Sequence, residues 1–298
     1  MAKVSICIPC YNNKEEVKRL LDSIVLQDYK DYEVIISDDS TNNEIEEMIS
    51  KEFGTIVDYH HNKKQLGHIY NWNEALKYAT GEYVKIMFSD DWFTYPDSLR
   101  KFVQLLEEQP DADFVFSGNF QVSSQSSYAR AATPEYVEEL KKDYRYLFIS
   151  NLVGAPSNTM YRRSTGARFD EKSNWASDVF LYFEVLKNQR KFVCTTEPLI
   201  SIGIHENQYT ESFQKRDDRI YQDYKYMYQK YNLQKNKMCR EHFVKMYLLP
   251  YHKGLQEWKN CGYITTEYIR RVIPYFWKDT ICSYTRAAFR KIRKLFVA

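Results

Sequence analysis

The arrangement of apolar residues along positions 1–118 is the feature that most constrains the fold. Short runs rich in branched and aromatic side chains, typical of buried strands, lie at 4–9, 32–37, 55–59, 83–88 and 114–116. Between them, segments such as 14–27 and 69–79 repeat apolar residues at helical spacing, and the second stops before Gly81 as if capped by it. This alternation predicts an α/β fold with a mostly parallel sheet flanked by helices.

Polar side chains follow three of the predicted strands. Asp38 and Asp39 end the second strand, and Ser89, Asp90 and Asp91 follow the strand at 83–88. The first strand ends in a polar loop at 9–12. Because ligands of open parallel sheets bind beyond the carboxyl ends of the strands, these segments predict one binding site at that edge. One acidic pair alone would equally suit a solvated turn.

Two common phosphate-binding motifs are absent from the sequence, which limits the kind of ligand we expect. The chain contains neither G-x-G-x-x-G nor the P-loop sequence, so it has no glycine cradle for phosphates. A divalent cation held by carboxylates would neutralise phosphates instead. The residues therefore predict a metal-assisted nucleotide site.

These segments resemble glycosyltransferase family 2, whose members have the Rossmann-like GT-A fold. The similar segments lie in the family's order at 4–12, 33–40, 79–83 and 89–91. The resemblance covers residues 3 to about 110 and continues more weakly to about 210. It implies inverting transfer of a sugar from a nucleotide-activated donor, usually a UDP-sugar, with Mn²⁺ or Mg²⁺ as cofactor.

The resemblance also implies roles on the donor side. Pro9, Tyr11 and Asp39 would line the nucleoside pocket, with Asp39 on the edge of the base. Asp38 is a further candidate for donor binding. These residues belong to the first two strand ends, where the nucleotide is expected.

The third strand end departs from the family pattern. Asp91 would be the metal ligand, and Asp90 would contact the donor sugar or ribose. Phe88 stands where many members carry the first carboxylate of a D-x-D motif. Successive strand side chains point to opposite faces, so we do not expect Asp90 and Asp91 to hold one ion together. Metal binding is then expected to depend on the donor's phosphates.

The second half of the chain supplies the acceptor side of the resemblance. Asp178 matches the family's catalytic base, which takes the proton of the acceptor hydroxyl. Alternatively, Ser177 caps a helix and Asp178 favours its dipole. Trp175 could stack on a sugar face or pack in the core, and Ser157 lies in a segment that resembles the acceptor-side loop.

His205 resembles a histidine that reaches the metal or pyrophosphate in some members. Imidazole is a competent ligand for a metal or a phosphate, although a lone histidine after a strand is more often structural. We therefore regard His205 as a second candidate metal ligand, in addition to Asp91.

The end of the chain has a different pattern. Apolar residues recur at helical spacing at 277, 281, 284, 288, 292 and 295, and basic residues surround them. Such a helix is typical of attachment to an anionic membrane surface, but it would also suit a helix packed on the protein with a solvated basic face. Both interpretations remain open at this point.

Composition limits the class of protein. There are 42 basic and 40 acidic residues, so no overall charge favours nucleic acid as a partner. The six cysteines are scattered, which favours reduced thiols in a cytoplasmic protein. No secretory signal precedes the first strand, and no apolar run approaches the roughly 18 residues of a membrane span.

We predict three parts: a nucleotide-sugar-binding α/β half at 1–118, an acceptor-binding half of the same domain at 119–215, and a helical region at 216–298. The predicted function is glycosyl transfer to a saccharide or lipid-linked saccharide in the synthesis of a bacterial surface polysaccharide such as a capsule. The protein would be cytoplasmic or peripheral on the inner face of the membrane.

Two alternatives accompany that function. A sugar-1-phosphate nucleotidyltransferase would have a related sheet, but such enzymes carry a glycine-rich loop where this chain has residues 10–13, Cys-Tyr-Asn-Asn. A non-catalytic, membrane-associated binding module is the other alternative, and Phe88 in place of a carboxylate favours it.

Overall fold

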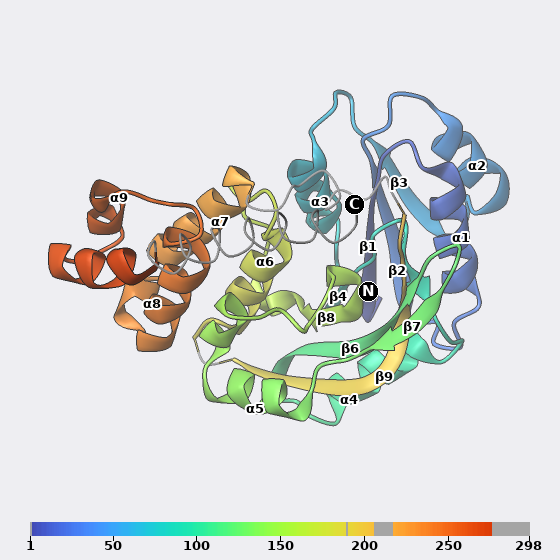
Figure 1. Ribbon diagram of the computed structural model, residues 1–298. Helices are drawn as coiled ribbons and strands as arrows, with labels where there is room; N and C mark the ends of the chain where they lie inside the picture. The colour runs from blue at the N-terminus through green and yellow to red at the C-terminus, as the bar shows by residue number, and fades with distance from the viewer. Residues whose placement is uncertain (1, 189, 206–216, 276–298) are drawn as a thin grey trace, which may run out of the picture. The chain divides into compact units, whose positions relative to one another are not determined.

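The computed structural model describes residues 2–188, 190–205 and 217–275 (Figure 1). The chain divides into two units, residues 1–214 and 215–298. The first contains a mixed sheet flanked by helices, and the described part of the second is helical. The predicted α/β class and the helical C-terminal region are thus confirmed.

Nine strands of the described residues form one sheet in the first unit. Its order is β3-β2-β1-β4-β8-β6-β9-β5, and β7 pairs with β6. The strands are β1 Val4–Cys10, β2 Tyr32–Asp38, β3 Val57–His61, β4 Tyr83–Ile86, β5 Trp92–Phe93, β6 Ala112–Val122, β7 Ser127–Arg130, β8 Thr159–Arg162 and β9 Lys191–Gly203. Figure 1 shows β6 and β9 curving side by side along one border of the unit.

The part of the sheet built from β3, β2, β1 and β4 is parallel throughout. Cys10 at the end of β1 lies opposite Asp38 at the end of β2, so the loops that follow these strands start beside each other. Antiparallel pairs enter with β8, which runs opposite to both β4 and β6. The parallel portion therefore coincides with the segment in which the sequence alternates most regularly.

Six α-helices of the described first unit accompany the sheet: α1 Lys14–Val25, α2 Glu44–Glu52, α3 His68–Lys77, α4 Ser98–Glu107, α5 Pro134–Lys142 and α6 Ser177–Leu186. In Figure 1, α1 and α2 lie on one side of β1–β3 and α3 on the other. The helical spacing in α1 puts Val17, Leu20, Leu21 and Ile24 in the core. Each such side chain contributes about 1.5–3 kcal/mol by leaving water.

Several segments differ from what their local sequence suggests. The serine-rich sequence at 123–133 is typical of a loop, but it contains β7, which forms a hairpin with β6. The short strands β5 and β8 were not predicted. The sequence at 135–149 would suit one helix, but α5 ends at Lys142 and a 3₁₀ turn, Tyr144–Phe148, follows it. The Asp143 carboxylate accepts a hydrogen bond from the Arg145 amide at the start of that turn.

Gly81 does not cap α3, because that helix already ends at Lys77. Instead, Gly81 lies against β1: a Cβ at this position would be 2.8 Å from the Ser5 amide nitrogen. The glycine is needed where the chain enters β4 beside β1. The sequence correctly indicates a need for glycine at position 81. The reason is the close approach to β1, and not the end of α3.

The second unit is described from residue 217 to 275 and consists of α7 Asp218–Lys230, α8 Lys237–Phe243, a π-helical turn Val244–Leu248, α9 Leu255–Asn260 and further helical residues at 265–275. Stacked rings form much of its core; the Tyr228 and Phe243 centroids, for example, are 4.3 Å apart. The basic helix predicted at 277–295 lies outside the described residues. Within the described part of the chain, no helix has the length and apolar character to span a membrane.

Candidate functional site

The loops after β1 and β2 are tied together by Asn12. Its amide donates to the Ser40 hydroxyl at 2.8 Å, and its side-chain oxygen accepts from the Thr41 amide at 3.0 Å. Asn12 has a φ of 52°, a left-handed conformation that asparagine tolerates better than most residues. These contacts fix the first two strand ends relative to each other.

Asn13 connects the same loop to the third strand end. It precedes α1 without capping it, and its side-chain amide donates to the Ser89 hydroxyl at 2.5 Å. The three polar strand ends therefore meet at one edge of the sheet, as predicted from their sequence. Neither Asn12 nor Asn13 was singled out as a candidate, although both follow directly after a predicted strand.

Asp39 holds the segment that leads into α3. One carboxylate oxygen accepts from the Asn62 side chain at 3.0 Å and from the Leu66 amide at 2.8 Å, and the other accepts from the Gly67 amide at 2.9 Å. Only 5% of Asp39 is exposed. The carboxylate thus lies among N–H donors beside the joined strand ends.

Asp38 points into the sheet. It is fully buried, and its carboxylate accepts from the Ser40 amide at 2.9 Å and from the Tyr59 hydroxyl at 2.7 Å. Burial and this hydrogen bond raise the pKa of the Tyr59 phenol, which therefore stays protonated as the donor. These contacts hold Asp38 at the edge of the sheet, and the donor contact expected of it from the sequence stays a prediction.

The other two nucleoside candidates differ in exposure. Pro9 is buried within β1. Tyr11, just beyond the strand, is 52% exposed, and its amide donates to the Asn13 side-chain oxygen at 3.2 Å. Tyr11 is therefore the side chain that the first strand end presents to solvent.

The neighbouring carboxylates Asp90 and Asp91 have different surroundings. Asp91 is 2% exposed and accepts hydrogen bonds from the Gly203 amide, at 3.3 Å, and from the Ser157 hydroxyl. Burial raises the pKa of Asp91 well above its usual range. Asp90 is more open: its carboxylate lies 3.2 Å from Nε2 of His205.

The two metal candidates from the sequence, Asp91 and His205, are therefore not paired with each other. His205 lies on Asp90, and both side chains of that pair are partly exposed. The described residues contain no group of three or more His, Cys, Asp or Glu side chains that could hold an ion. A metal in this position would need further oxygen ligands from the donor or from water.

The backbone around Asp90 is held from two sides. A guanidinium nitrogen of Arg19 on α1 donates to the Asp90 carbonyl at 2.7 Å, and the same group stacks over the Trp92 ring at 4.1 Å. At the end of β9, a Cβ on Gly203 would be 2.5 Å from that carbonyl oxygen. Glycine therefore allows β9 to approach closely enough to place His205.

Ser157 is hydrogen-bonded to the loop at 88–91. It is fully buried, and its hydroxyl accepts from the Phe88 amide at 2.9 Å. Its carbonyl accepts from the amine of Lys85, a fully buried residue of β4 that also donates to the Thr159 carbonyl at 3.2 Å. Ser157 thus contacts the loop at 88–91, and the acceptor-side role expected of it from the sequence stays a prediction.

Asp178 lies in the first turn of α6. Its carboxylate accepts from the Asn151 side chain at 2.6 Å and from the Val179 amide at 2.7 Å. Ser177 does not cap the helix: it is the first helical residue, and its hydroxyl donates to the Asn174 carbonyl at 3.2 Å. Trp175, just before the helix, is 36% exposed.

Residues 151–158 connect two carboxylate regions, Asp178 on α6 and the loop that carries Asp90 and Asp91. Asn151 contacts Asp178 at one end of this segment, and Ser157 contacts the loop at 88–91 near the other. The Tyr182 hydroxyl of α6 donates to the Gly154 carbonyl at 2.8 Å, which fastens the segment to the same helix. Asn151 was not among the predicted site residues, since nothing in its local sequence marks it.

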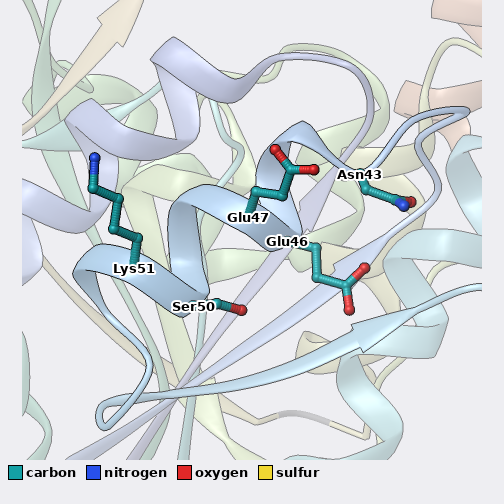
Figure 2. Close-up of a pocket in the computed structure, with 5 residues that line it drawn as sticks. All are labelled: Asn43, Glu46, Glu47, Ser50 and Lys51. Carbon is teal, nitrogen blue, oxygen red and sulfur yellow. The ribbon is translucent and has the colours of Figure 1, made fainter.

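Figure 2 shows a hollow along α2, lined by Asn43, Glu46, Glu47, Ser50 and Lys51. It contains none of the residues that the sequence or the strand ends single out. The side chains shown come from α2 and the residue before it, so no second element contributes a converging group. We therefore place the functional site at the joined strand ends.

Comparisons with known proteins identify the family of this chain. The family model described as Glycosyl transferase family 2 matches residues 5–166. The amylovoran biosynthesis glycosyltransferase AmsB of Erwinia amylovora is 28% identical over 65% of this chain and 67% of its own. The span that the family model matches includes most of β1, all of β2 and β4, and the loop at 88–91.

Two solved structures show the same fold at low sequence identity. Staphylococcus aureus TarS, in complex with UDP-GlcNAc, superposes with a TM-score of 0.64 at 17% identity, covering 92% of this chain and 79% of TarS. The Pyrobaculum calidifontis mannosyltransferase PcManGT, in complex with GDP-Man and Mn²⁺, gives a TM-score of 0.52 at 16% identity, covering 97% and 86%. The predicted GT-A fold is confirmed.

Proposed function

This chain belongs to Glycosyl transferase family 2 and is a glycosyltransferase, and on that premise we propose that it moves a sugar from a UDP-sugar to a saccharide acceptor with inversion. The acceptor would be a growing surface polysaccharide or a lipid-linked glycan. The similarity to AmsB supports polysaccharide synthesis, and the fold shared with the UDP-GlcNAc complex of TarS supports a UDP-linked donor. The observation that carries the proposal is the joining of three polar strand ends beside the Asp90–His205 pair.

The nucleoside would bind where the loops after β1 and β2 meet. Asp39 lies there among N–H donors, and a carboxylate oxygen has more than one lone pair, so it can also accept from the N–H of a pyrimidine base. Tyr11 supplies an exposed ring on the neighbouring loop. We keep these two residues as the nucleoside contacts.

Asp90 and His205 would hold the divalent cation. A carboxylate and an imidazole are both suitable ligands for Mn²⁺, and this pair is partly exposed, whereas Asp91 is enclosed by Gly203 and Ser157. The metal role proposed from the sequence for Asp91 therefore passes to Asp90. When bound, the cation would neutralise charge on the diphosphate leaving group.

Asp178 would act as the base. As the acceptor oxygen attacks the anomeric carbon, its proton passes to the Asp178 carboxylate, and the bond from that carbon to the UDP oxygen breaks with its electron pair on UDP. The Asn151 amide donates to one carboxylate oxygen and fixes the orientation of the group. Trp175, exposed beside α6, would contact the acceptor sugar.

The test compares Asp178→Asn with the wild type. Asparagine keeps the size of the side chain but cannot take the proton, so we expect transfer to fall by about 10²–10⁴-fold. Binding of UDP with Mn²⁺, measured by calorimetry, is expected to be unchanged. Activity would be followed as UDP release from a panel of nucleotide sugars.

Asp111→Asn is the matched control, because Asp111 is a largely exposed aspartate whose carboxylate forms an ion pair with Lys191 at 3.2 Å. It is expected to behave like the wild type in both measurements. Full transfer activity in Asp178→Asn would refute the base role, and failure of the wild type to bind any nucleoside diphosphate would refute the donor site.

A further inference from the structure

Lys85 is a fully buried lysine on β4, the strand at which the parallel part of the sheet meets the antiparallel strand β8. It lies on β4 opposite Ile6 of β1, with its amine 4.5 Å from the centre of the Phe102 ring and 5.6 Å from that of Phe93. An amine buried among apolar groups is costly unless it is hydrogen-bonded, and its burial lowers the pKa of Lys85 well below its usual range. A methionine or leucine would fill this volume without that cost.

The lysine amine is directed at the segment that connects the two carboxylate regions. It donates to the carbonyl of Ser157 and, at 3.2 Å, to that of Thr159. Residues 156–158 form a single 3₁₀ turn that ends where β8 begins. The lysine therefore holds the turn from within the sheet.

Ser157 transmits this contact to the donor side. Its hydroxyl accepts from the Phe88 amide at 2.9 Å and donates to Asp91. Both contacts are made to residues that flank Asp90 within the short loop after β4. Ser157 thus connects the Lys85 amine to the loop at 88–91.

We propose that Lys85 is a positioning residue for Asp90, acting through Ser157 to set the loop at 88–91 in the place where Asp90 and His205 meet a metal-bound diphosphate. This role rests on the proposed function. It also accounts for a charged residue at the centre of a strand that is otherwise apolar from 83 to 88. The alternative is that Lys85 contributes only to the stability of the core.

The experiment measures UDP affinity twice on the full-length protein, with EDTA and with Mn²⁺, for the wild type and Lys85→Met. The dissociation constant in EDTA divided by the dissociation constant with Mn²⁺ measures the metal-dependent part of binding. We expect Lys85→Met to keep the affinity measured in EDTA and to lower the ratio by about 10-fold or more, as changes to supporting groups around metal ligands do. A purely structural role would change the melting temperature and leave this ratio at the wild-type value.

Lys142→Met is the control, since Lys142 is an exposed lysine paired with Glu139 at the end of α5. It should leave the ratio unchanged. A high ratio in the wild type that persists in Lys85→Met would overturn the role of Lys85 alone. A wild-type ratio of one would overturn the metal site and, with it, this role.

Ser157→Ala provides a second variant if Lys85→Met does not fold. It removes the hydroxyl that accepts from Phe88 and leaves the backbone carbonyl that Lys85 contacts. The same loss of the metal-dependent part of UDP affinity is expected, and a wild-type ratio in a folded Ser157→Ala protein would overturn the proposal.

Discussion

The adjacent carboxylates Asp38 and Asp39 differ because successive strand side chains point in opposite directions. Asp38 ends β2 with its carboxylate turned to Tyr59 and the Ser40 amide. Asp39 turns to the amides that lead into α3. One residue therefore supports the sheet edge, and the other lies where we propose that the nucleoside binds.

Exchanging each aspartate for asparagine separates these roles. Each change replaces an oxygen acceptor with an N–H donor facing other donors, so both variants should lose about 1–3 kcal/mol in the free energy of unfolding. Only Asp39→Asn is expected to weaken UDP binding. A carboxamide has one acceptor oxygen where the carboxylate has two, so it cannot accept from the same backbone amides and also from the N–H of the base. Urea denaturation and calorimetry with UDP would measure the two effects. Equal losses of UDP affinity in both variants would contradict this division.

The same geometry explains how far the sequence predicts single residues. Tyr11, Asp39 and Asp90 follow local strand patterns, and the structure brings their loops together. The sequence predicted Asp91 as the metal ligand, whereas our proposal of Asp90 rests on contacts with Gly203 and His205 from the distant end of β9. Site roles set by such contacts require the tertiary structure.

At the scale of elements, β9 links the two halves of the first unit. It pairs with β6 along most of its length and with β5 near its end. Because β5 follows the loop at 88–91 directly, pairing β9 with β5 brings residue 203 to the Asp90 carbonyl. The strand thus carries His205 to the donor side.

Gly203→Ala tests this close approach. The added Cβ would lie 2.5 Å from a backbone oxygen, so β9 or the loop must move. We expect a loss of about 1–3 kcal/mol in the free energy of unfolding, together with weaker Mn²⁺-dependent UDP binding. Gly254→Ala is the control: a Cβ there meets no atom within 4 Å and φ is −72°, so stability should stay within about 1 kcal/mol. Unchanged stability and binding in Gly203→Ala would show that β9 does not constrain the loop.

Elements with strong local patterns were predictable, and elements made by distant pairing were not. α1 and β2 carry their periodicity within their own residues. β5 has only the residues Trp92–Phe93 and exists because β9 pairs with it, and β8 is a strand because β4 and β6 lie on either side. No property of a segment of two to four residues could have indicated this.

At the scale of the whole molecule, the proposed site residues all belong to the first unit. They extend from Tyr11 to His205, and this unit comprises residues 1–214. Its core is continuous along the chain, from Val4 in β1 to Ile202 in β9. Nucleotide binding should therefore be a property of this unit.

A fragment that ends at Gln214 tests that expectation. Because it retains the core and the proposed ligands of base and metal, we expect it to fold cooperatively and to bind UDP with Mn²⁺ within about threefold of the full chain, a difference below 1 kcal/mol. Circular dichroism during thermal unfolding would establish folding, and calorimetry would give the affinity. Asp39→Asn in the fragment should weaken UDP binding as it does in the full chain, which controls for nonspecific binding. A folded fragment that fails to bind UDP would show that residues beyond 214 complete the donor site.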